Sequence, residues 1–346
     1  MLKRTTTIQP SKWKTLNNMI NDNSQFANGP DIEAKIQQVY KPRFITYGAA
    51  TEILGAMESL LTRPSISRPR NMIVPSVRNN GKTSILEKFI RDHPRTEHPD
   101  GTKIQVPVLS IQGTEADERR FYKRLLGAVE WPFLDRPDSE ALRNQTLRML
   151  RELGVKMIII DEFHSLAVSS ANSQRAFLAK LKTFCNDIRI PMVVFGTSVA
   201  GNTLRSYEEL DNRFRTIDLP EWTLSTKEGT TALRRLLTTF QSVLPLQKTP
   251  ALKGLTNQIF LEAAGNAKRN SVTFGELWEV VEAAAVKALR QGLPAITKDV
   301  IAGLRVKREG ALDKGGNVRG GANGVSGDTF KRGQIDDKDG KTSPED

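Results

Sequence analysis

Two short segments of the chain carry residue types that bind and cleave a nucleoside triphosphate. The first, VPSVRNNGKTSIL (74–86), is an apolar strand followed by a loop that ends in Gly81-Lys82-Thr83 and by helix-forming residues. The backbone N–H groups of such a loop and the N-terminus of the following helix can bind phosphates. Lys82 would reach the β- and γ-phosphates, and the Thr83 hydroxyl would bind Mg²⁺. The residues expected to contact the nucleotide are Ser76, Val77, Arg78, Asn79, Asn80, Gly81, Lys82, Thr83 and Ser84.

The second segment, VKMIIIDEFH (155–164), is an apolar strand that ends in Asp161-Glu162. Asp161 is expected to bind the metal together with Thr83, and the adjacent Glu162 to polarise the attacking water. An acidic pair can also start a helix, because carboxylates stabilise a helix N-terminus. The position directly after an apolar strand favours the metal and water roles. The two segments together predict a chain that binds and hydrolyses ATP.

The loop departs from the usual spacing G-x-x-x-x-G-K-[ST] at its first glycine, which is replaced by Ser76. Serine can enter such a loop but gives up the freedom of glycine at positive φ. The following Asn79 and Asn80 can adopt left-handed conformations at low cost. We therefore expect binding to be retained and turnover to be the property that Ser76 affects. A nucleotide-binding scaffold without turnover stays open as an alternative.

Two further segments hold candidates for catalysis beside Lys82 and Glu162. Thr197 follows the apolar strand 192–195, and its hydroxyl could sense the γ-phosphate or orient water; a plain turn residue is the alternative. Arg213 and Arg215 lie around the start of the last strand, in ELDNRFRTIDLP. An arginine here, Arg213 first, could complete a neighbouring subunit's site by stabilising charge on the transferred phosphoryl group, whereas surface ion pairing is the alternative.

The elements that must position these residues alternate between apolar strands and amphipathic helices. This alternation predicts an α/β fold, a parallel sheet covered by helices on both faces. Ligands of such sheets bind at the carboxyl ends of the strands, where the loop, Asp161 and Thr197 fall. Ser139 is the expected N-cap of its helix. Strands are predicted at 72–76, 104–111, 156–160, 192–195 and 215–219, and helices at 49–61, 83–92, from Asp117 onward, at 139–153 and at 172–189.

Composition divides the chain into four parts. Residues 1–42 are polar and predict an N-terminal arm with one or two short helices, and residues 43–222 form the α/β core. Residues 223–304 show helical patterns only and predict a small all-helical lid. The tail, 305–346, holds nine of the 25 glycines and little apolar content, so we expect it to be disordered. The lid helices are predicted at 226–243, 252–264, 272–291 and 297–305.

The formal net charge of +12 favours a polyanionic partner, nucleic acid before an acidic membrane. Four basic residues lie largely away from the apolar stripe of the helix that opens at Asp117. They could contact the phosphates of a DNA backbone or form only a solvated face. These residues are Arg119, Arg120, Lys123 and Arg124.

The single cysteine, Cys185, excludes an internal disulfide and a multi-cysteine zinc site. It falls on an apolar helical stripe, so we expect a buried structural thiol. No apolar run approaches the roughly 18 residues of a membrane span, and the first residues do not resemble a secretory signal. We therefore expect a cytoplasmic protein without membrane contacts.

With these residues assembled, roughly residues 43–290 resemble the TniB/TnsC-type transposition ATPases of the AAA+ superfamily. The resemblance rests on RFITYGAATEILGAMESLL, SVRNNGKTSILEKF, DERRFYKRLL, LGVKMIIIDEFHSL, IRIPMVVFGT and LDNRFRTIDLPEW. It implies a P-loop AAA+ ATPase that uses ATP and Mg²⁺ and assembles as a homo-oligomer, a ring or a helical filament, on double-stranded DNA. Implied partners are a transposase and a target-selection protein, TniQ-like or CRISPR-associated. By match, Arg213 is the arginine finger, Thr197 the sensor, and Lys268 and Arg269 candidates for a lid sensor.

The predicted function is therefore an ATP-dependent, DNA-binding regulator of transposition in which hydrolysis acts as a timer on assembly. One rival is another AAA+ DNA machine, such as a replication initiator or a helicase loader. Others are the scaffold without turnover and an ATPase switch on an acidic membrane.

Overall fold

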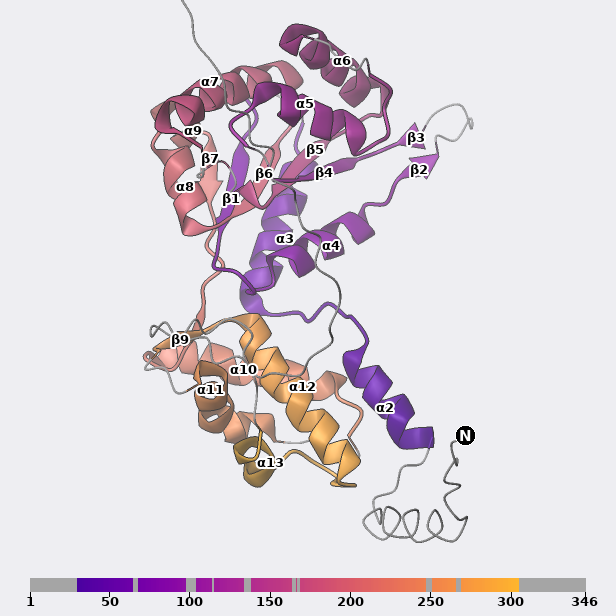
Figure 1. The fold of residues 1–346 in the computed structure, drawn as a ribbon, viewed down its shortest axis with the longest axis vertical. Helices are drawn as coiled ribbons and strands as arrows, with labels where there is room; N and C mark the ends of the chain where they lie inside the picture. The colour runs from indigo at the N-terminus through magenta and orange to yellow at the C-terminus, as the bar shows by residue number, and fades with distance from the viewer. Residues whose placement is uncertain are drawn as a thin grey trace, which may run out of the picture. The chain divides into compact units, whose positions relative to one another are not determined.

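The structure is a computed structural model (Figure 1). The described residues belong to one compact unit, 1–306. The predicted arm up to residue 29, the tail from residue 305, His164 and Lys268 lie outside the described residues. The structure describes residues 30–64, 68–97, 104–113, 115–133, 138–163, 166, 169–246, 251–265 and 269–304.

A five-stranded parallel sheet forms the centre of the core, in the order β4-β5-β6-β1-β7. Three of its strands, β1, β5 and β6, are buried along their whole length, which explains why they are continuous apolar runs in the sequence. The predicted α/β fold with a parallel sheet is confirmed. The strands are β1 (Asn71–Pro75), β4 (Val108–Gln112), β5 (Met157–Asp161), β6 (Met192–Gly196) and β7 (Phe214–Thr216).

Strand register brings the chemically active residues to one level. Pro75 of β1 lies beside Gly196 of β6, so the next residue in each strand, Ser76 and Thr197, follow at the same height. Ile160 of β5 lies beside Val194 of β6, which places Asp161 level with Phe195, two residues before Thr197. The loop after β1 and the ends of β5 and β6 therefore meet at the carboxyl edge of the sheet.

Helices cover both faces of the sheet (Figure 1). Helices α3 (Gly48–Leu61) and α4 (Lys82–Asp92) share an apolar cluster with one face, through side chains such as Met57 and Phe89. Helices α5 (Glu118–Gly127), α6 (Ser139–Glu152) and α7 (Ala171–Ile188) pack on the other. Cys185 of α7 is buried in this second cluster, and burial raises the pKa of its thiol to about 12.

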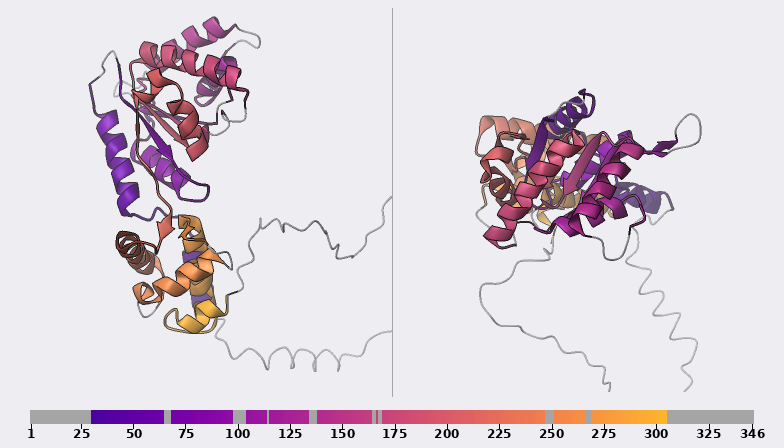
Figure 2. Two further views of the ribbon diagram at one scale, coloured as in Figure 1. Left: turned by 90° about the vertical axis from the view of Figure 1, so that its left-hand side faces the viewer. Right: turned by 90° about the horizontal axis from the view of Figure 1, so that it is seen from above.

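The predicted strand 104–111 is wrong as a single element. Residues Ile104–Gln105 form β3, which pairs antiparallel with β2 (Thr96–Glu97), and β4 begins only at Val108. Pro107 separates the two, because proline lacks the N–H that a ladder needs. Its carbonyl instead accepts from the N–H of Met157 at 3.1 Å. The β2–β3 hairpin projects beyond the sheet in Figure 2.

The segment after residue 223 is helical, as expected, apart from one short ladder. Trp222–Thr223 (β8) pairs antiparallel with Ser271–Val272 (β9). Each of these strands has only two residues, which is too short to show the alternation of a strand in the sequence. Five helices follow or flank it: α10 (Lys227–Val243), the 3₁₀ helix η2 (Leu252–Leu255), α11 (Thr256–Ala264), α12 (Phe274–Arg290) and α13 (Lys298–Ala302).

Helix α2 (Pro30–Tyr40) packs on the lid. Its residues Ile36 and Val39 are buried in the same apolar cluster as Leu277 and Val281 of α12. Ile32 lies against this cluster too, so the spacing i, i+4, i+7 gives α2 one apolar face. The last part of the segment grouped with the N-terminal arm is thus a packed helix.

Other differences from the predicted elements are local. Helices α8 (Ser198–Arg205) and α9 (Glu208–Asp211) had no clear signal in the sequence. The N-cap of α6 is Asp138, which accepts from Ala141 N, and not Ser139. Strand β7 ends at Thr216, although the N–H of Ile217 still donates to Ile73 O.

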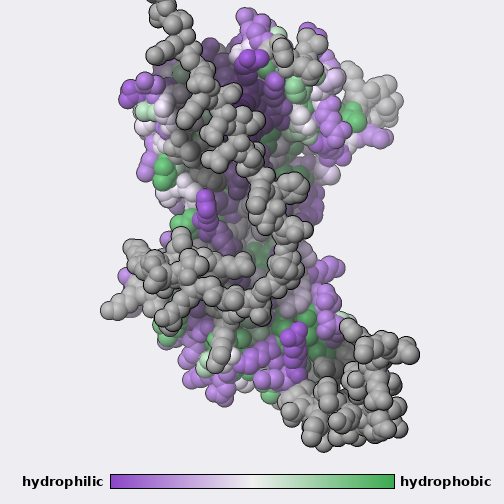
Figure 3. Space-filling view, in the orientation of Figure 1, coloured by the Kyte–Doolittle hydropathy of each residue, from purple (hydrophilic) through white to green (hydrophobic). Residues whose placement is uncertain are grey.

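The described residues show two properties that concern membranes and surfaces. None of the helices in this part of the chain is long and apolar enough to cross a membrane. On the face shown in Figure 3, the described part of the core is mostly hydrophilic, and hydrophobic residues form small separate groups.

Candidate nucleotide site

A cleft of about 530 Å³ opens at the carboxyl edge of the sheet. Ser76, which is buried, and Val77 are not among its lining residues, whereas the rest of the predicted phosphate loop is. The lining residues are Arg78, Asn79, Asn80, Gly81, Lys82, Thr83, Ser84, Asp161, Glu162 and Thr197. The cleft thus gathers residues that follow three different strands.

Backbone conformation explains where the loop needs glycine. Asn79 and Gly81 have φ of 56° and 88°, in the left-handed region that glycine and asparagine tolerate. A Cβ on Gly81 would also lie 3.1 Å from the Tyr47 hydroxyl oxygen. Ser76 is not among the described residues with positive φ. The freedom that serine gives up is therefore not needed at position 76.

The Ser76 hydroxyl instead links the loop by hydrogen bonds to the segment that follows β7. Its Oγ donates to Leu219 O at 2.9 Å and accepts from Asn80 Nδ2 at 3.0 Å. Its backbone N–H donates to Gly196 O of β6 at 2.9 Å. A glycine here would lose the two side-chain bonds.

Lys82 lies at the start of α4, with its ammonium folded over the loop. Its Nζ donates to Ser76 O at 3.1 Å and to Val77 O at 2.5 Å. Burial lowers the pKa of the ammonium, and the nearby carboxylates of Asp161 and Glu162 raise it in part. The cation is thereby held inside the curve of the loop, where phosphate oxygens would be bound.

Asp161 and Thr83 face each other across the cleft. Asp161 is 2 % exposed, its Oδ1 accepts from Glu162 N at 2.8 Å, and its Oδ2 lies 3.5 Å from Thr83 Oγ1. Burial raises the pKa of this carboxyl, and the hydrogen bond from Glu162 N–H lowers it in part. The two side-chain oxygens fit Mg²⁺, which binds oxygen and takes few protein ligands where phosphates and water supply the others.

Glu162 and Thr197 complete the described lining. Glu162 has a φ of 53°, unusual for a residue with a long side chain, and its side chain is exposed at the cleft. Thr197 is the N-cap residue of α8, yet its hydroxyl makes no capping bond. Both side chains therefore border the space in which a nucleotide's terminal phosphate would lie.

Arg213 and Arg215 are not part of this cleft. Phe214 pairs with Asn71, the first residue of β1, so both arginines lie toward the amino edge of the sheet, about 13 Å away along a five-residue strand. Arg213 Nη1 donates to Asn186 Oδ1 of α7 at 2.5 Å. A role in a neighbouring subunit's site stays a prediction.

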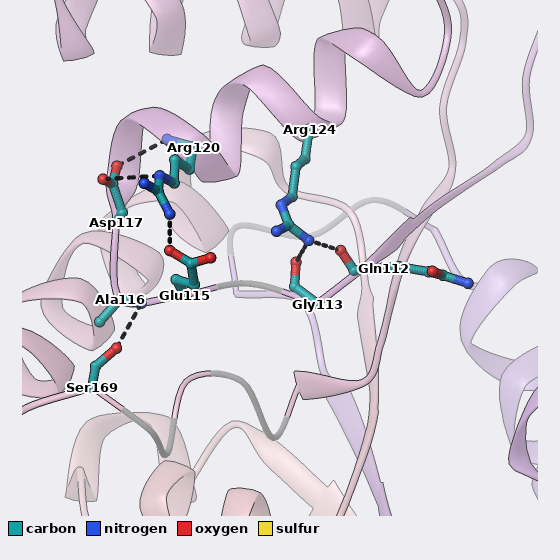
Figure 4. Close-up of polar contacts among 8 residues, drawn as sticks. All are labelled: Gln112, Gly113, Glu115, Ala116, Asp117, Arg120, Arg124 and Ser169. Atoms are coloured by element: carbon teal, nitrogen blue, oxygen red, sulfur yellow. Dashed lines mark hydrogen bonds and ion pairs between the residues drawn. The ribbon is translucent and has the colours of Figure 1, made fainter. Parts of the chain in front are cut away.

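Two basic residues of α5, Arg120 and Arg124, are engaged with the segment that precedes the helix (Figure 4). Arg120 pairs with Glu115 and Asp117, and Arg124 Nη1 donates to Gln112 O and, at 2.6 Å, to Gly113 O. Lys123 Nζ lies 5.8 Å from the centre of the Phe133 ring, and Arg119 is exposed. Contact with DNA through these residues stays a prediction.

Sequence reasoning did not find the contacts between the loop and the lid. Tyr47 stacks on Phe274 of α12, with ring centres 5.3 Å apart, and meets Trp222 edge-on at 5.5 Å. The lid candidate Arg269 donates to Glu276 Oε1 at 2.6 Å. Because the partners lie far apart in the sequence, no local spacing signals these contacts.

Comparison with known proteins identifies related sequences and folds. The family described as "Bacterial TniB protein" matches residues 35–224. A search of curated proteins found no match.

Solved structures share the fold at low identity. The crystal structure of Cdc6p from Pyrobaculum aerophilum is 15% identical over 75% of this chain and 67% of that one, with a TM-score of 0.50. The Aeropyrum pernix ORC1 protein in complex with DNA is 15% identical over 73% of this chain and 63% of that one, with a TM-score of 0.47. The chain spans about two thirds of their length. The first likeness shows that this chain shares the fold of that protein.

Proposed function

Because the chain belongs to the TniB family, whose match covers more than half of it, we propose that it is an ATP-dependent regulator of DNA transposition. The observation that carries the proposal is the cleft in which Lys82, Thr83, Asp161 and Glu162 converge. A loop of backbone donors, a partly buried lysine and two carboxylates at a strand end suit a metal-bound triphosphate.

Each residue of the cleft has a proposed part in the reaction. The loop and Lys82 bind the phosphates, and Thr83 and Asp161 hold Mg²⁺, which would neutralise charge on the phosphate oxygens. Glu162 accepts a hydrogen bond from the attacking water and takes its proton. Thr197 orients the same water through its hydroxyl.

Assembly is proposed from the place of Arg213. Since it lies at the edge of the sheet opposite the cleft, it can stabilise the transferred phosphoryl group only in the site of another copy. ATP would thus join neighbouring copies into a ring or a filament on duplex DNA, with the basic residues of α5 on the phosphates. A transposase and a target-selection protein are the proposed partners, in the cytoplasm.

Phosphate release from Mg²⁺–ATP, measured with and without duplex DNA, tests the proposal. We expect release that duplex DNA stimulates and that Lys82→Ala abolishes. The matched control is Lys88→Ala, on the same helix but in a surface pair with Asp92. Binding of ATP without release would favour the scaffold, and no binding by folded protein would exclude the proposal. Electron microscopy with duplex DNA and a slowly hydrolysed ATP analogue would show the assembly.

A further inference from the structure

The N-terminus of lid helix α12 is capped by the phosphate loop. The first N–H groups of a helix have no partner within it. In α12, a capping box satisfies two of these groups: Glu276 N–H donates to Thr273 Oγ1 at 3.3 Å, and Thr273 N–H donates to Glu276 Oε2 at 2.9 Å. The N–H groups of Phe274 and Gly275 donate instead to Asn80 Oδ1 at 3.0 Å and to Asn79 O at 2.9 Å. Half of the capping of this helix thus comes from a different part of the chain.

Asn80 has its whole amide group engaged in this contact. The side chain is buried, with 1 % exposed, and its oxygen accepts from Phe274 N. Its NH₂ group faces three acceptors: Ser76 Oγ at 3.0 Å, Leu219 O at 3.1 Å and Pro220 O at 3.0 Å. One side chain therefore links the phosphate loop, the chain that leaves the core and the first turn of α12.

The loop and the helix also approach closely. A Cβ on Gly275 would lie 2.1 Å from Asn79 Oδ1, so a larger residue here would have to displace the Asn79 side chain. The stack of Tyr47 on Phe274 closes the contact from the side. A displacement of α12 must either break the bonds to Asn79 and Asn80 or move the loop with it.

We propose that Asn80 is a positioning residue that fixes lid helix α12 to the phosphate loop, so that nucleotide occupancy and lid orientation change together. The inference deepens the proposed function, on which its nucleotide step rests. Asn80 acts through the loop and through α12. Because its side chain hydrogen-bonds only protein groups, phosphate binding is left to the backbone of the loop and to Lys82.

Hydrogen exchange of backbone amides in the full-length chain tests the contact directly. In Asn80→Ala, we expect the amide of Phe274 to exchange at least about tenfold faster, because its acceptor is gone. Amides of β5 and β6 should exchange as in the wild type, which shows that the core is intact. Exchange at Phe274 within twofold of the wild type would overturn the inference.

A variant in the lid tests the coupling to the nucleotide. Phe274→Pro removes the N–H that donates to Asn80 Oδ1, at the first helical position, where proline is tolerated. Phe274→Ala is the matched control, because it also loses the ring but keeps the N–H. Since Phe274 does not line the cleft, a purely structural role predicts equal ATP affinities for the two variants, whereas coupling predicts binding about fivefold weaker in Phe274→Pro by calorimetry. Equal affinities of Phe274→Pro and Phe274→Ala would overturn the coupling.

The two measurements separate this inference from the proposed function. If the folded protein binds no ATP, the proposed function fails, but the exchange at Phe274 still decides whether the loop caps α12. If ATP binds and both variants behave as the wild type, only the positioning role of Asn80 fails.

Discussion

The cleft at the carboxyl edge and the basic face of α5 are two regions built in opposite ways. In the cleft, side chains that follow β1, β5 and β6 meet, and buried bonds such as Asp161–Glu162 N hold them. On α5, four basic residues lie on one helix, at or near the surface, and two of them, Arg120 and Arg124, contact the preceding segment.

The difference teaches which kind of site a sequence can reveal. In a site built at strand ends, each active residue directly follows an apolar strand, and this order can be recognised in the sequence. A charged helix face leaves only composition, because solvated and ligand-binding faces use the same residues. The cleft can therefore be argued from geometry, whereas the role of α5 needs an experiment.

The two regions are connected through Gly113. Arg124 donates to the carbonyl of Gly113, and the N–H of Gly113 donates to Asp161 O at 2.7 Å. The loop before α5 thus runs directly beside the strand end that carries the metal-binding carboxylate. Variants in either region are informative if they change either the ATP reaction or DNA binding and leave the other unchanged.

The largest effect is expected from Lys82→Ala. The loss of a partly buried charge on phosphate should weaken ATP binding by about 100-fold or more. Isothermal titration calorimetry measures the affinity, and thermal unfolding confirms that the chain remains folded. If the variant still binds ATP as tightly, Lys82 contributes no more to binding than a lysine on an ordinary charged surface would.

Glu162→Gln should leave ATP binding nearly unchanged and slow phosphate release by about 100-fold, because the water loses its base. Assemblies with ATP on duplex DNA should then last longer, since hydrolysis is proposed as their timer. Single-molecule lifetimes on DNA measure this. An unchanged lifetime would refute the timer and leave the site's binding role standing.

Removing two charges from α5, in Arg119→Ala with Lys123→Ala, should weaken duplex binding by about tenfold and reduce its salt dependence. The matched control removes Arg148 and Arg151, exposed residues of α6. Arg124→Ala should act differently, with phosphate release lowered more than DNA affinity, because its contacts are with the loop beside Asp161. Equal DNA affinity in the α5 and α6 double variants would reduce the α5 face to a solvated surface.

The smallest effect is expected from Asp161→Asn on stability. Because burial raises the pKa of Asp161 in the folded chain, folding disfavours its charged form, so the carboxylate costs stability at neutral pH and the cost fades as the pH falls. Asparagine should raise the melting temperature at pH 7 by on the order of 2 °C and by less at acidic pH. Differential scanning calorimetry across pH measures this, and Mg²⁺-dependent ATP binding should be lost in the same variant.

The sequence predicted the buried strands and the residues at their ends, because each apolar run was followed directly by polar residues with a defined chemistry. It could not predict that Ser76 serves as a hydrogen-bonding residue, since its partners Asn80 and Leu219 depend on the fold. For the same reason the capping of α12 by Asn80 was invisible: the two are almost 200 positions apart. Short elements such as the β8–β9 ladder failed for lack of length, because two residues show no period.

The lone thiol of Cys185 makes the natural chain a ready background for site-specific chemistry. It is 1 % exposed, and burial raises its pKa to about 12, so very little of the reactive thiolate forms at pH 7. A maleimide dye or spin label would therefore attach almost solely to a cysteine introduced at the surface. Slow modification of Cys185 itself would then time the opening of the core around α7, without any change to the protein.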